Sequence, residues 1–397
     1  MQTGVFGKKP SEPIATIVAS AELDPAKNGR SFLELHVAAV AAALADAGIA
    51  PADVDGLVCV GDMMGAGVEH TFLSEEIQDY FLFANLRMQL GVQLGGASHL
   101  AMLEVAARAI QDGTCARILC VSAGTFPPIR DSGRSLMQMV CHPDYELPFA
   151  PSIPTIYGLM GQAWLDATGL GRDALAEAVT AQQAWATSHP VALGRDAGPL
   201  PVAEVLSARP IAGPFAYYDC SIPCEGGGAF VLSAPQAAGD FPHRPVHIVG
   251  TGEAHTHGFV LSLRDLSTTA AVDAGCVAFA RAGRTPADMD FCQLYDAFSS
   301  NPLMLLEELG FAERGKAVEL YREGRTWPGG DLPVNTNGGL LRFGHAGTAS
   351  GICGLLEAHA QMTGRARGIQ LERADLALVH AYGSMLCSHV TVILEAG

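Results

Sequence analysis

Short apolar segments alternate with Ala-rich segments of helical character along most of the 397-residue chain. The apolar segment at 56–61 follows an Ala-rich stretch from Leu35 to Ala47, and the segment at 291–298 follows one from Thr269 to Ala282. The apolar residues of such segments are consecutive rather than alternating with polar ones, which is typical of strands that helices cover on both faces. The pattern therefore predicts an α/β fold.

An internal repeat relates the two halves of the chain. Residues 47–55 read AGIAPADVD and residues 282–290 read AGRTPADMD, with Ala, Gly, Pro, Ala and two Asp in register. In each copy we expect Gly to end a helix and Pro-Ala-Asp to start a turn into the next strand. A chance similarity between Ala-rich helix ends is the alternative explanation.

A second helix and strand follow each copy of the repeat. The first half continues with a helix expected over about 95–111 and a strand at 116–124, and the second half with a helix over about 344–363 and a strand at 375–383. Two such halves imply two similar α/β lobes related by a pseudo-twofold axis. Any functional site is then expected where helix N-termini from both lobes converge.

The domain limits follow from this division. We predict an N-terminal lobe at 1–240 and a C-terminal lobe at 241–397. The first lobe carries a Pro-rich insertion at about 125–216, in which the stretch from Arg172 to Thr187 is expected to be helical. The insertion is expected to form a cap over one edge of the lobe, and a Gly turn and strand at 224–235 close the first half.

The charge balance excludes some partners. The chain has 24 Lys and Arg against 41 Asp and Glu, a formal net charge of −17. Such a surface repels nucleic acid and anionic membranes, so neither is an expected partner. A local Arg cluster could still bind a small anion within a Debye length of about 8–10 Å.

The cellular location and the cysteines also follow from composition. Residues 1–20 contain prolines and charges where a signal peptide needs an apolar run, and no long uncharged apolar span follows, so we expect a cytoplasmic protein. The ten cysteines are scattered along the chain, and we expect them to be reduced thiols. Cys220 and Cys224 lack a second pair or a nearby His, so no metal site is expected.

Five segments carry a resemblance to a known family. They are GGASHLAMLEVAARAIQDG at 95–113, SIPTIYGLMGQAWLDATG at 152–169, PIAGPFAYYDCSIPCEGGGAFVL at 210–232, LYDAFSSNPLMLLEELG at 294–310 and VNTNGGLLRFGHAGTASG at 334–351. The chain resembles the thiolase superfamily and, more narrowly, the sterol-carrier-protein-type thiolases. This resemblance implies the thiolase fold with five αβαβα layers, a homodimer and a coenzyme A thioester as substrate.

The departures from the family pattern concern its catalytic groups. Thiolases hold a nucleophilic Cys at the N-terminus of a buried helix, and that position falls at about Gly95 here. The family's second Cys falls on Ala381, and its Asn or His that binds the carbonyl oxygen is replaced by Tyr295. The histidine of the family's GHP motif is retained as His345. Without both thiols, the acyl-enzyme of Claisen chemistry cannot form at these positions.

This combination is similar to the thiolase-like aldolases of steroid side-chain degradation. The similarity implies retro-aldol cleavage of a 3-hydroxyacyl-CoA without a cofactor, with a steroid-like or aromatic acyl group. His345 would hold the thioester oxyanion, and Tyr295 would take the hydroxyl proton after nearby positive charge has lowered its pKa. A second Tyr of those enzymes falls on Phe343, and Tyr382 is a substitute for it. Gly95 would leave space for the acyl chain.

Further candidates surround these motifs. Ser98 and His99 lie just inside the first-lobe helix, where Ser98 either caps the helix or faces the site, and His99 either packs or faces the vacated space. Asp296 is expected to orient the loop that follows the strand. Arg130, Arg134 and Arg342 are candidates for the coenzyme A phosphates.

Two other functions remain open. The chain could be a non-catalytic thiolase-like subunit that binds acyl-CoA or scaffolds an active partner. It could also be an acyl-CoA acyltransferase whose nucleophile has moved, for example to Cys353 or Cys141. Relatives of the aldolase type often work with a small OB-fold, zinc-ribbon subunit, so the resemblance implies such a partner.

Overall fold

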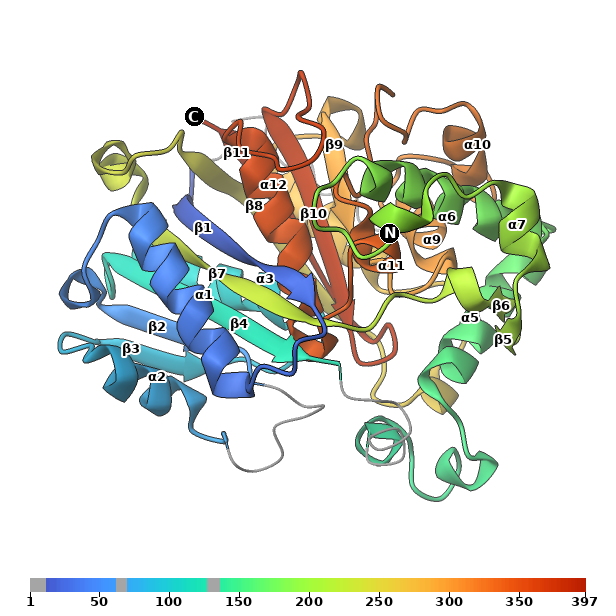
Figure 1. Cartoon of the computed structure of the whole chain (residues 1–397), viewed down its shortest axis with the longest axis horizontal. Coiled ribbons are helices and arrows are strands. Elements are labelled where there is room, and N and C mark those ends of the chain that lie inside the picture. The colour runs from blue at the N-terminus through green and yellow to red at the C-terminus, as the bar shows by residue number, and fades with distance from the viewer. Residues whose placement is uncertain (1–11, 62–69, 127–135) are drawn as a thin grey trace.

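The computed structural model describes residues 12–61, 70–126 and 136–397. The strands of its main sheet are β1 (Ala15–Ala26), β2 (Gly56–Cys59), β3 (Met88–Gly91), β4 (Arg117–Thr125), β7 (Glu225–Ser233), β8 (Val246–His255), β9 (Phe291–Leu294), β10 (Leu376–Gly383) and β11 (Ser388–Ala396). Among the described residues these nine strands form one mixed sheet in the order β3-β2-β4-β7-β1-β8-β11-β10-β9 (Figure 1).

Apart from β3, which has no counterpart among the described strands, the two halves of the sheet have the same topology. β2 is parallel to β3 and β4, and β9 is parallel to β10, whereas the remaining neighbours are antiparallel. β1 and β8 pair antiparallel from Ala15 to Ile17 and join the halves. β2, β4, β7 and β1 therefore correspond to β9, β10, β11 and β8, as a pseudo-twofold relation requires.

Helices separate and cover the two halves. They are α1 (Phe32–Ala47), α2 (Leu73–Phe81), α3 (Ser98–Gln111), α5 (Ile153–Thr168), α6 (Arg172–Thr187), α7 (Val202–Ser207), α8 (Ala271–Ala282), α9 (Ser300–Glu308), α10 (Ala317–Arg322), α11 (Gly339–Arg342) and α12 (Cys353–Met362). α3 and α12 share one apolar core with strands of both halves. α1 packs on the outer face of the first half and α8 on that of the second. The five αβαβα layers of the thiolase fold are thus confirmed.

The internal repeat marks equivalent positions in the two halves. α1 ends at Gly48 with φ +67°, and α8 ends at Gly283 with φ +63°, a left-handed conformation that favours glycine. A 3₁₀ turn follows each, at Pro51–Asp53 and Pro286–Asp288, and leads into β2 and β9. The repeat is therefore structural rather than a chance similarity.

Three expected elements are shorter than the apolar pattern predicts. The helix expected from about 95 begins at Ser98, and the one expected from 344 begins as a 3₁₀ turn at Gly347–Ile352. β9 ends at Leu294, and the Asn335 side chain bonds both the N–H and the carbonyl of that residue, at 2.7 and 2.9 Å. The next residue, Tyr295, lies just beyond the strand.

The insertion in the first half forms a helical cap, but this cap packs against the second half rather than over an edge of the first lobe as expected. α5, α6, α7 and a two-stranded ribbon of β5 (Pro210–Ala212) and β6 (Phe215–Ala216) lie beside the second half of the sheet (Figure 1). The observed limits of α6, Arg172–Thr187, match the sequence prediction. Trp185 anchors this helix by donating to the Thr326 carbonyl at 3.0 Å. The limits of the two lobes at 240 and 241 stay predictions.

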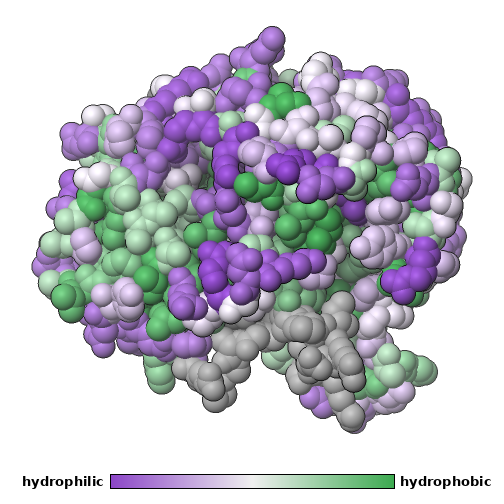
Figure 2. Space-filling view, viewed as in Figure 1, coloured by the Kyte–Doolittle hydropathy of each residue, from purple (hydrophilic) through white to green (hydrophobic). Residues whose placement is uncertain are grey.

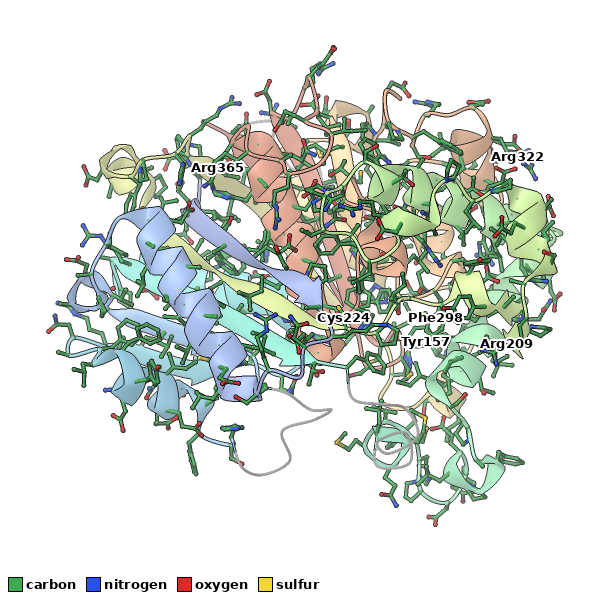
Figure 3. The ribbon with its side chains drawn as sticks, viewed as in Figure 1. Tyr157, Arg209, Cys224, Phe298, Arg322 and Arg365 are labelled. Carbon is green, nitrogen blue, oxygen red and sulfur yellow. The ribbon has the colours of Figure 1, made fainter. Side chains whose placement is uncertain are left out.

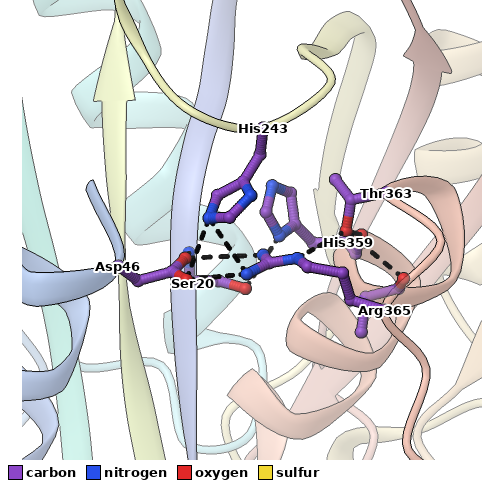
Figure 4. A network of polar contacts seen from close by, with 7 residues as sticks. Ser20, Asp46, His243, His359, Thr363 and Arg365 are labelled. Atoms are coloured by element: carbon purple, nitrogen blue, oxygen red, sulfur yellow. Dashed lines mark hydrogen bonds and ion pairs between the residues drawn. The ribbon is translucent and has the colours of Figure 1, made fainter. Parts of the chain in front are cut away.

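A polar network ties the two halves together (Figure 4). The Asp46 carboxylate at the end of α1 accepts from Arg365, beyond α12, at 2.6 Å and from the Ser20 backbone at 3.0 Å. His243 lies 2.9 Å from the same carboxylate, and His359 of α12 lies 2.8 Å from the Ser20 hydroxyl. These contacts fix the relative position of halves that each contribute to one site.

The surface is mixed in character. Figure 2 shows hydrophilic and hydrophobic residues intermingled over this face of the molecule. Within the described ranges, no helix is long and apolar enough to cross a membrane.

Candidate active site

Tyr295 and His345 form the centre of the site. Tyr295 follows β9, where its backbone N–H donates to the His380 carbonyl at 3.0 Å. His345 follows α11, and its N–H donates to the Ile222 carbonyl at 2.8 Å. The Tyr295 hydroxyl lies 3.1 Å from His345 Nε2, and both side chains line the same cavity. Two residues that are fifty positions apart are thus held within hydrogen-bond distance.

The hydrogen bonds of Ser350 determine which nitrogen of His345 carries the proton. The Ser350 hydroxyl donates to the Gly347 carbonyl at 2.8 Å and lies 2.9 Å from His345 Nδ1. Because the single hydroxyl proton points at the carbonyl, Nδ1 is the donor to Ser350. Nε2 then carries the lone pair and accepts from Tyr295. Burial lowers the pKa of His345 to about 4, so the ring is neutral at pH 7.

The expectation that positive charge lowers the pKa of Tyr295 is wrong. Burial raises the pKa of this phenol well above its usual value, and Tyr157, Cys353 and Asp296 raise it further. Tyr295 is therefore a protonated phenol that donates to His345. It can pass a proton on only while it receives another.

The helix tip beside this pair is formed by Gly95 and Gly96, which both line the cavity. A Cβ added to Gly95 would lie 2.9 Å from the Ser384 backbone nitrogen, whereas one added to Gly96 would lie 2.5 Å from the Tyr295 ring and 2.5 Å from the Tyr382 carbonyl oxygen. Gly96, rather than Gly95, therefore faces the catalytic candidates. The space expected for the acyl chain at Gly95 is not open, because backbone lies against Gly95 and the Tyr295 ring fills the space at Gly96.

A cavity of about 690 Å³ opens in front of the pair. The first half contributes the helix tip, the cap contributes apolar side chains such as Leu136, Met137 and Tyr157, and the second half contributes Phe298. Figure 3 shows Tyr157 and Phe298 close together, and their rings stack at 4.8 Å. No Asp, Glu, Lys or Arg is among the described residues that line the cavity. Its size and lining suit a large, uncharged, mainly apolar group.

Ser98 and His99 serve the helix start rather than the cavity. The Ser98 hydroxyl donates to the Gly95 carbonyl at 2.6 Å and accepts from the Leu94 N–H at 2.7 Å. His99 is fully buried, with its ring nitrogens 3.2 Å from the Gly96 carbonyl and 3.0 Å from the Ser122 hydroxyl. Neither residue lines the cavity, which agrees with the interpretation of His99 as a packed histidine. The interpretation of Ser98 as a cap is not supported, because Ala97 is the N-cap of α3 and no side chain caps it.

Asp296, Phe343 and Arg342 lie behind the site. Asp296 accepts from the Leu340 N–H at 2.6 Å and so orients the start of α11. Arg342 is buried, donates to the Tyr218 carbonyl and has its guanidinium 5.4 Å from the centre of the Tyr218 ring. The prediction that Arg342 binds coenzyme A phosphate is therefore not supported by its position. Phe343 packs edge-on against a cap residue, 5.1 Å from the His189 ring, and does not line the cavity.

Tyr382 supports Tyr295 but does not reach the cavity. Its hydroxyl donates to Asn301 Oδ1 at 2.6 Å, and its ring meets that of Tyr295 edge-on at 4.7 Å. This geometry does not support the expectation that Tyr382 replaces a second catalytic Tyr, because its hydroxyl is engaged away from the cavity. Arg130 and Arg134 lie outside the described residues.

Sequence reasoning missed Ser350 and Tyr157. Both lie in segments that carry the family resemblance, but a serine among small residues and a tyrosine in an amphipathic helix give no separate signal. Ser350 fixes the tautomer of His345, and Tyr157 brings a phenol to the cavity from the cap. Their roles depend on contacts between distant segments.

No thiol lies at the helix tip, where Gly95 and Gly96 stand. Of the ten cysteines, all of which lie within the described residues, Cys220 lines the cavity, and burial raises its pKa to about 12. Burial also raises the pKa of Cys353 and that of Cys141, and neither lines the cavity. The described residues hold no group of three or more His, Cys, Asp or Glu side chains in a metal-binding arrangement.

The fold and the site together define a thiolase-type α/β protein with glycine at the catalytic helix tip. Residues 252–396 match the family model described as "Thiolase C-terminal domain-like". A steroid side-chain-cleaving aldolase of Thermomonospora curvata is 30% identical over 340 residues, which cover 79% of this chain and 82% of that protein. The chain belongs to the thiolase superfamily and is similar to its sterol-carrier-protein-type members, near the aldolases.

Two further comparisons find similarity to a transferase and to an aldolase. An acetyl-CoA acetyltransferase of Methanothermobacter thermautotrophicus is 27% identical over 369 residues, which cover 89% of this chain and 91% of that protein. The solved structure of an Ltp2–ChsH2(DUF35) aldolase has a TM-score of 0.83 at 26% identity and covers 98% of this chain and 99% of its own. Relatives thus include enzymes of both types.

Proposed function

We propose that the protein is a carbon–carbon lyase that cleaves a 3-hydroxyacyl-CoA by a retro-aldol reaction. The observation that carries the proposal is the Tyr295–His345 pair at 3.1 Å, which faces the cavity where glycine stands at the helix tip. The pair supplies proton transfer, and the tip supplies no nucleophile. Retro-aldol cleavage needs proton transfer and does not need a nucleophile from the protein.

The protonation state of the pair defines the first step. The substrate's 3-hydroxyl donates to the Tyr295 oxygen while Tyr295 passes its own proton to His345 Nε2. This relay avoids a free phenolate, which burial disfavours because it raises the pKa of Tyr295. The C3–O bond becomes a carbonyl, the C2–C3 bond breaks, and its electron pair forms the thioester enolate.

The second step stabilises the enolate and returns the proton. After the transfer, His345 Nε2 bears hydrogen and becomes a donor toward the thioester oxygen, the role expected from the sequence. The N-terminus of α3 presents the positive end of its dipole beside Gly96. The proton then moves to C2 to give the shorter acyl-CoA. The products are a ketone or an aldehyde and an acyl-CoA, and no cofactor is needed.

The cavity indicates the substrate class. The described residues of its lining carry no Asp, Glu, Lys or Arg, and this lining and the volume of about 690 Å³ favour a bulky apolar acyl group over a short one. A steroid-like or aromatic group fits both this cavity and the relative that cleaves steroid side chains. The acyl group enters between the cap and the second half of the sheet.

We further propose that the protein forms a homodimer and works with a small OB-fold, zinc-ribbon subunit. Support for a second subunit comes from the Ltp2–ChsH2(DUF35) aldolase, which this chain covers almost completely. Co-expression with a co-encoded small protein, followed by co-purification and native mass spectrometry, tests both statements. A chain that purifies alone as a monomer contradicts them.

Cleavage itself is measured with purified protein, alone and with the partner. Steroid-like, aromatic and straight-chain 3-hydroxyacyl-CoAs are incubated, and the released carbonyl compound and shorter acyl-CoA are quantified by mass spectrometry. We expect equimolar products from the bulky substrates, and loss of both in Tyr295→Phe. Binding without cleavage would instead indicate the non-catalytic subunit.

The acyltransferase alternative is tested by alkylation. The raised pKa values of Cys220, Cys353 and Cys141 predict slow reaction with iodoacetamide and unchanged lyase activity. Inactivation that follows the labelling of one of these thiols would favour the transferase.

A further inference from the structure

The turn between β10 and β11 has an unusual backbone. Ser384, Met385 and Leu386 have φ values of +47°, +60° and +62°. Left-handed backbone is costly for residues with a Cβ, and three such residues in succession persist only where neighbouring groups impose the conformation. Ser384 and Met385 line the cavity, so the groups that impose it also shape the site.

Two histidines donate to consecutive carbonyls of this turn. His257 Nε2 lies 3.2 Å from the Met385 carbonyl oxygen, and His389 Nε2 lies 3.0 Å from the Leu386 carbonyl oxygen. A carbonyl oxygen only accepts, so both Nε2 atoms carry hydrogen. The two rings come from different elements, one from the segment after β8 and one from β11.

A buried chain of hydrogen bonds fixes the tautomer of His389. Its Nδ1 lies 3.0 Å from His380 Nε2, and His380 Nδ1 lies 2.8 Å from the Thr391 hydroxyl. Because His389 Nε2 donates to the turn, Nδ1 accepts from His380, and His380 in turn accepts from Thr391. The Thr256 hydroxyl lies 2.9 Å from Nδ1 of His257 and donates to it, so that His257 Nε2 also carries the hydrogen. Each imidazole is thus held with Nε2–H directed at the turn.

The turn contacts two other parts of the cavity wall. Its Ser384 nitrogen lies against Gly95 at the helix tip, 2.9 Å from the position of an added Cβ. Burial raises the pKa of Tyr157, and a hydrogen bond with the Met385 backbone acts in the opposite direction. The backbone of the turn therefore touches both the helix tip and the cavity-facing phenol of the cap.

We propose that His257 and His389 are positioning residues, which hold the Ser384–Leu386 turn in its left-handed conformation by donating to its carbonyls and thereby fix the cavity wall around the reacting substrate. The inference about the reaction rests on the proposed lyase function. The inference about the turn rests on the hydrogen bonds alone. Neither histidine lines the cavity, so they act through the turn.

His257→Leu and His389→Leu remove the two donors, and His389→Gln restores an N–H near the position of Nε2. His247→Leu is the matched control, because His247 lies in β8, the strand that precedes His257, and bonds Thr16 rather than the turn or the measured peptide. Hydrogen exchange of the peptide around 383–388, thermal unfolding and steady-state kinetics are measured for each full-length variant. His257 is only partly buried, so its variant remains informative if His389→Leu does not fold.

We expect faster exchange in this peptide for both Leu variants, little change for the control, and recovery in His389→Gln. With a bulky 3-hydroxyacyl-CoA, kcat should fall by up to about 10²-fold in the Leu variants while KM changes by about twofold or less, and Gln should restore most of kcat. Wild-type exchange in folded Leu variants overturns the proposal, as does wild-type kcat in them. If the wild-type protein cleaves no substrate, the proposed function fails, and the exchange data still decide whether the histidines hold the turn.

Discussion

Gly96→Ala tests the close contact between the helix tip and Tyr295. The added methyl group would lie 2.5 and 2.7 Å from two atoms of the Tyr295 ring and 2.5 Å from the Tyr382 carbonyl oxygen. The carbonyl belongs to β10, in the interior of the sheet, so it cannot move aside cheaply. Overpacking of this kind typically costs about 1–3 kcal/mol. We expect a loss of stability of that size.

The same substitution should also abolish most of the activity. A displaced Tyr295 ring moves its hydroxyl away from His345 Nε2, and a misplacement of about 1 Å can cost roughly 10²-fold in rate. Urea unfolding gives the free energy, and product release gives kcat. Gly239→Ala is the control, because its added Cβ has no atom within 4 Å and its backbone is not left-handed. A Gly96→Ala variant that matches the control in stability and in turnover would contradict the close contact between Gly96 and the Tyr295 ring.

Three further predictions concern the titratable groups. Tyr295→Phe should lower kcat by about 10²–10⁴-fold with little change in KM, because the ring contacts remain and the proton relay is lost; near-normal kcat would remove Tyr295 from the mechanism. Burial lowers the pKa of His345 to about 4, so kcat/KM should stay flat from pH 8 to about 5 and fall only near pH 4, where Nε2 is protonated; a fall centred near pH 6.5 contradicts this. Burial raises the pKa of Asp296 to about 8, so the folded protein binds this proton more tightly than the unfolded chain, and stability declines as pH rises from about 4 to 8. Asp296→Asn should gain stability relative to wild type over that range in urea unfolding, and a constant difference would count against a buried proton.

The fold was largely predictable because its signals are local. Consecutive apolar residues predict strands that helices cover on both faces. Gly48 and Gly283 mark the ends of helices, where the backbone takes the left-handed conformation that favours glycine. The observed limits of α6 agree with the prediction because its spacing is regular and a glycine precedes it. The contact of Leu294, the last residue of β9, with Asn335 was not predictable, because it joins residues that are forty-one positions apart in the sequence.

The site was predictable only in part. The family motifs place Tyr295 and His345 together, but their protonation depends on Ser350 and on burial, which no spacing reveals. Tyr382 lies in β10 next to Ala381, the position of the family's second Cys, yet its hydroxyl donates to Asn301. The expectation that a nearby cation lowers the pKa of Tyr295 failed because desolvation, which depends on the folded surroundings, sets that pKa.

Glycine at position 96 and tyrosine at position 295 depend on each other for space. A side chain at Gly96 and the ring of Tyr295 require the same space, because the added Cβ already lies 2.5 Å from that ring. A chain of this backbone therefore holds either a thiol at the helix tip or a phenol beside His345, not both. Glycine at position 96 leaves room for the Tyr295 ring, and any larger residue there would have to displace the ring. On this argument Gly96→Cys alone does not restore acyl transfer, because the new thiol would displace the phenol before it could reach a substrate.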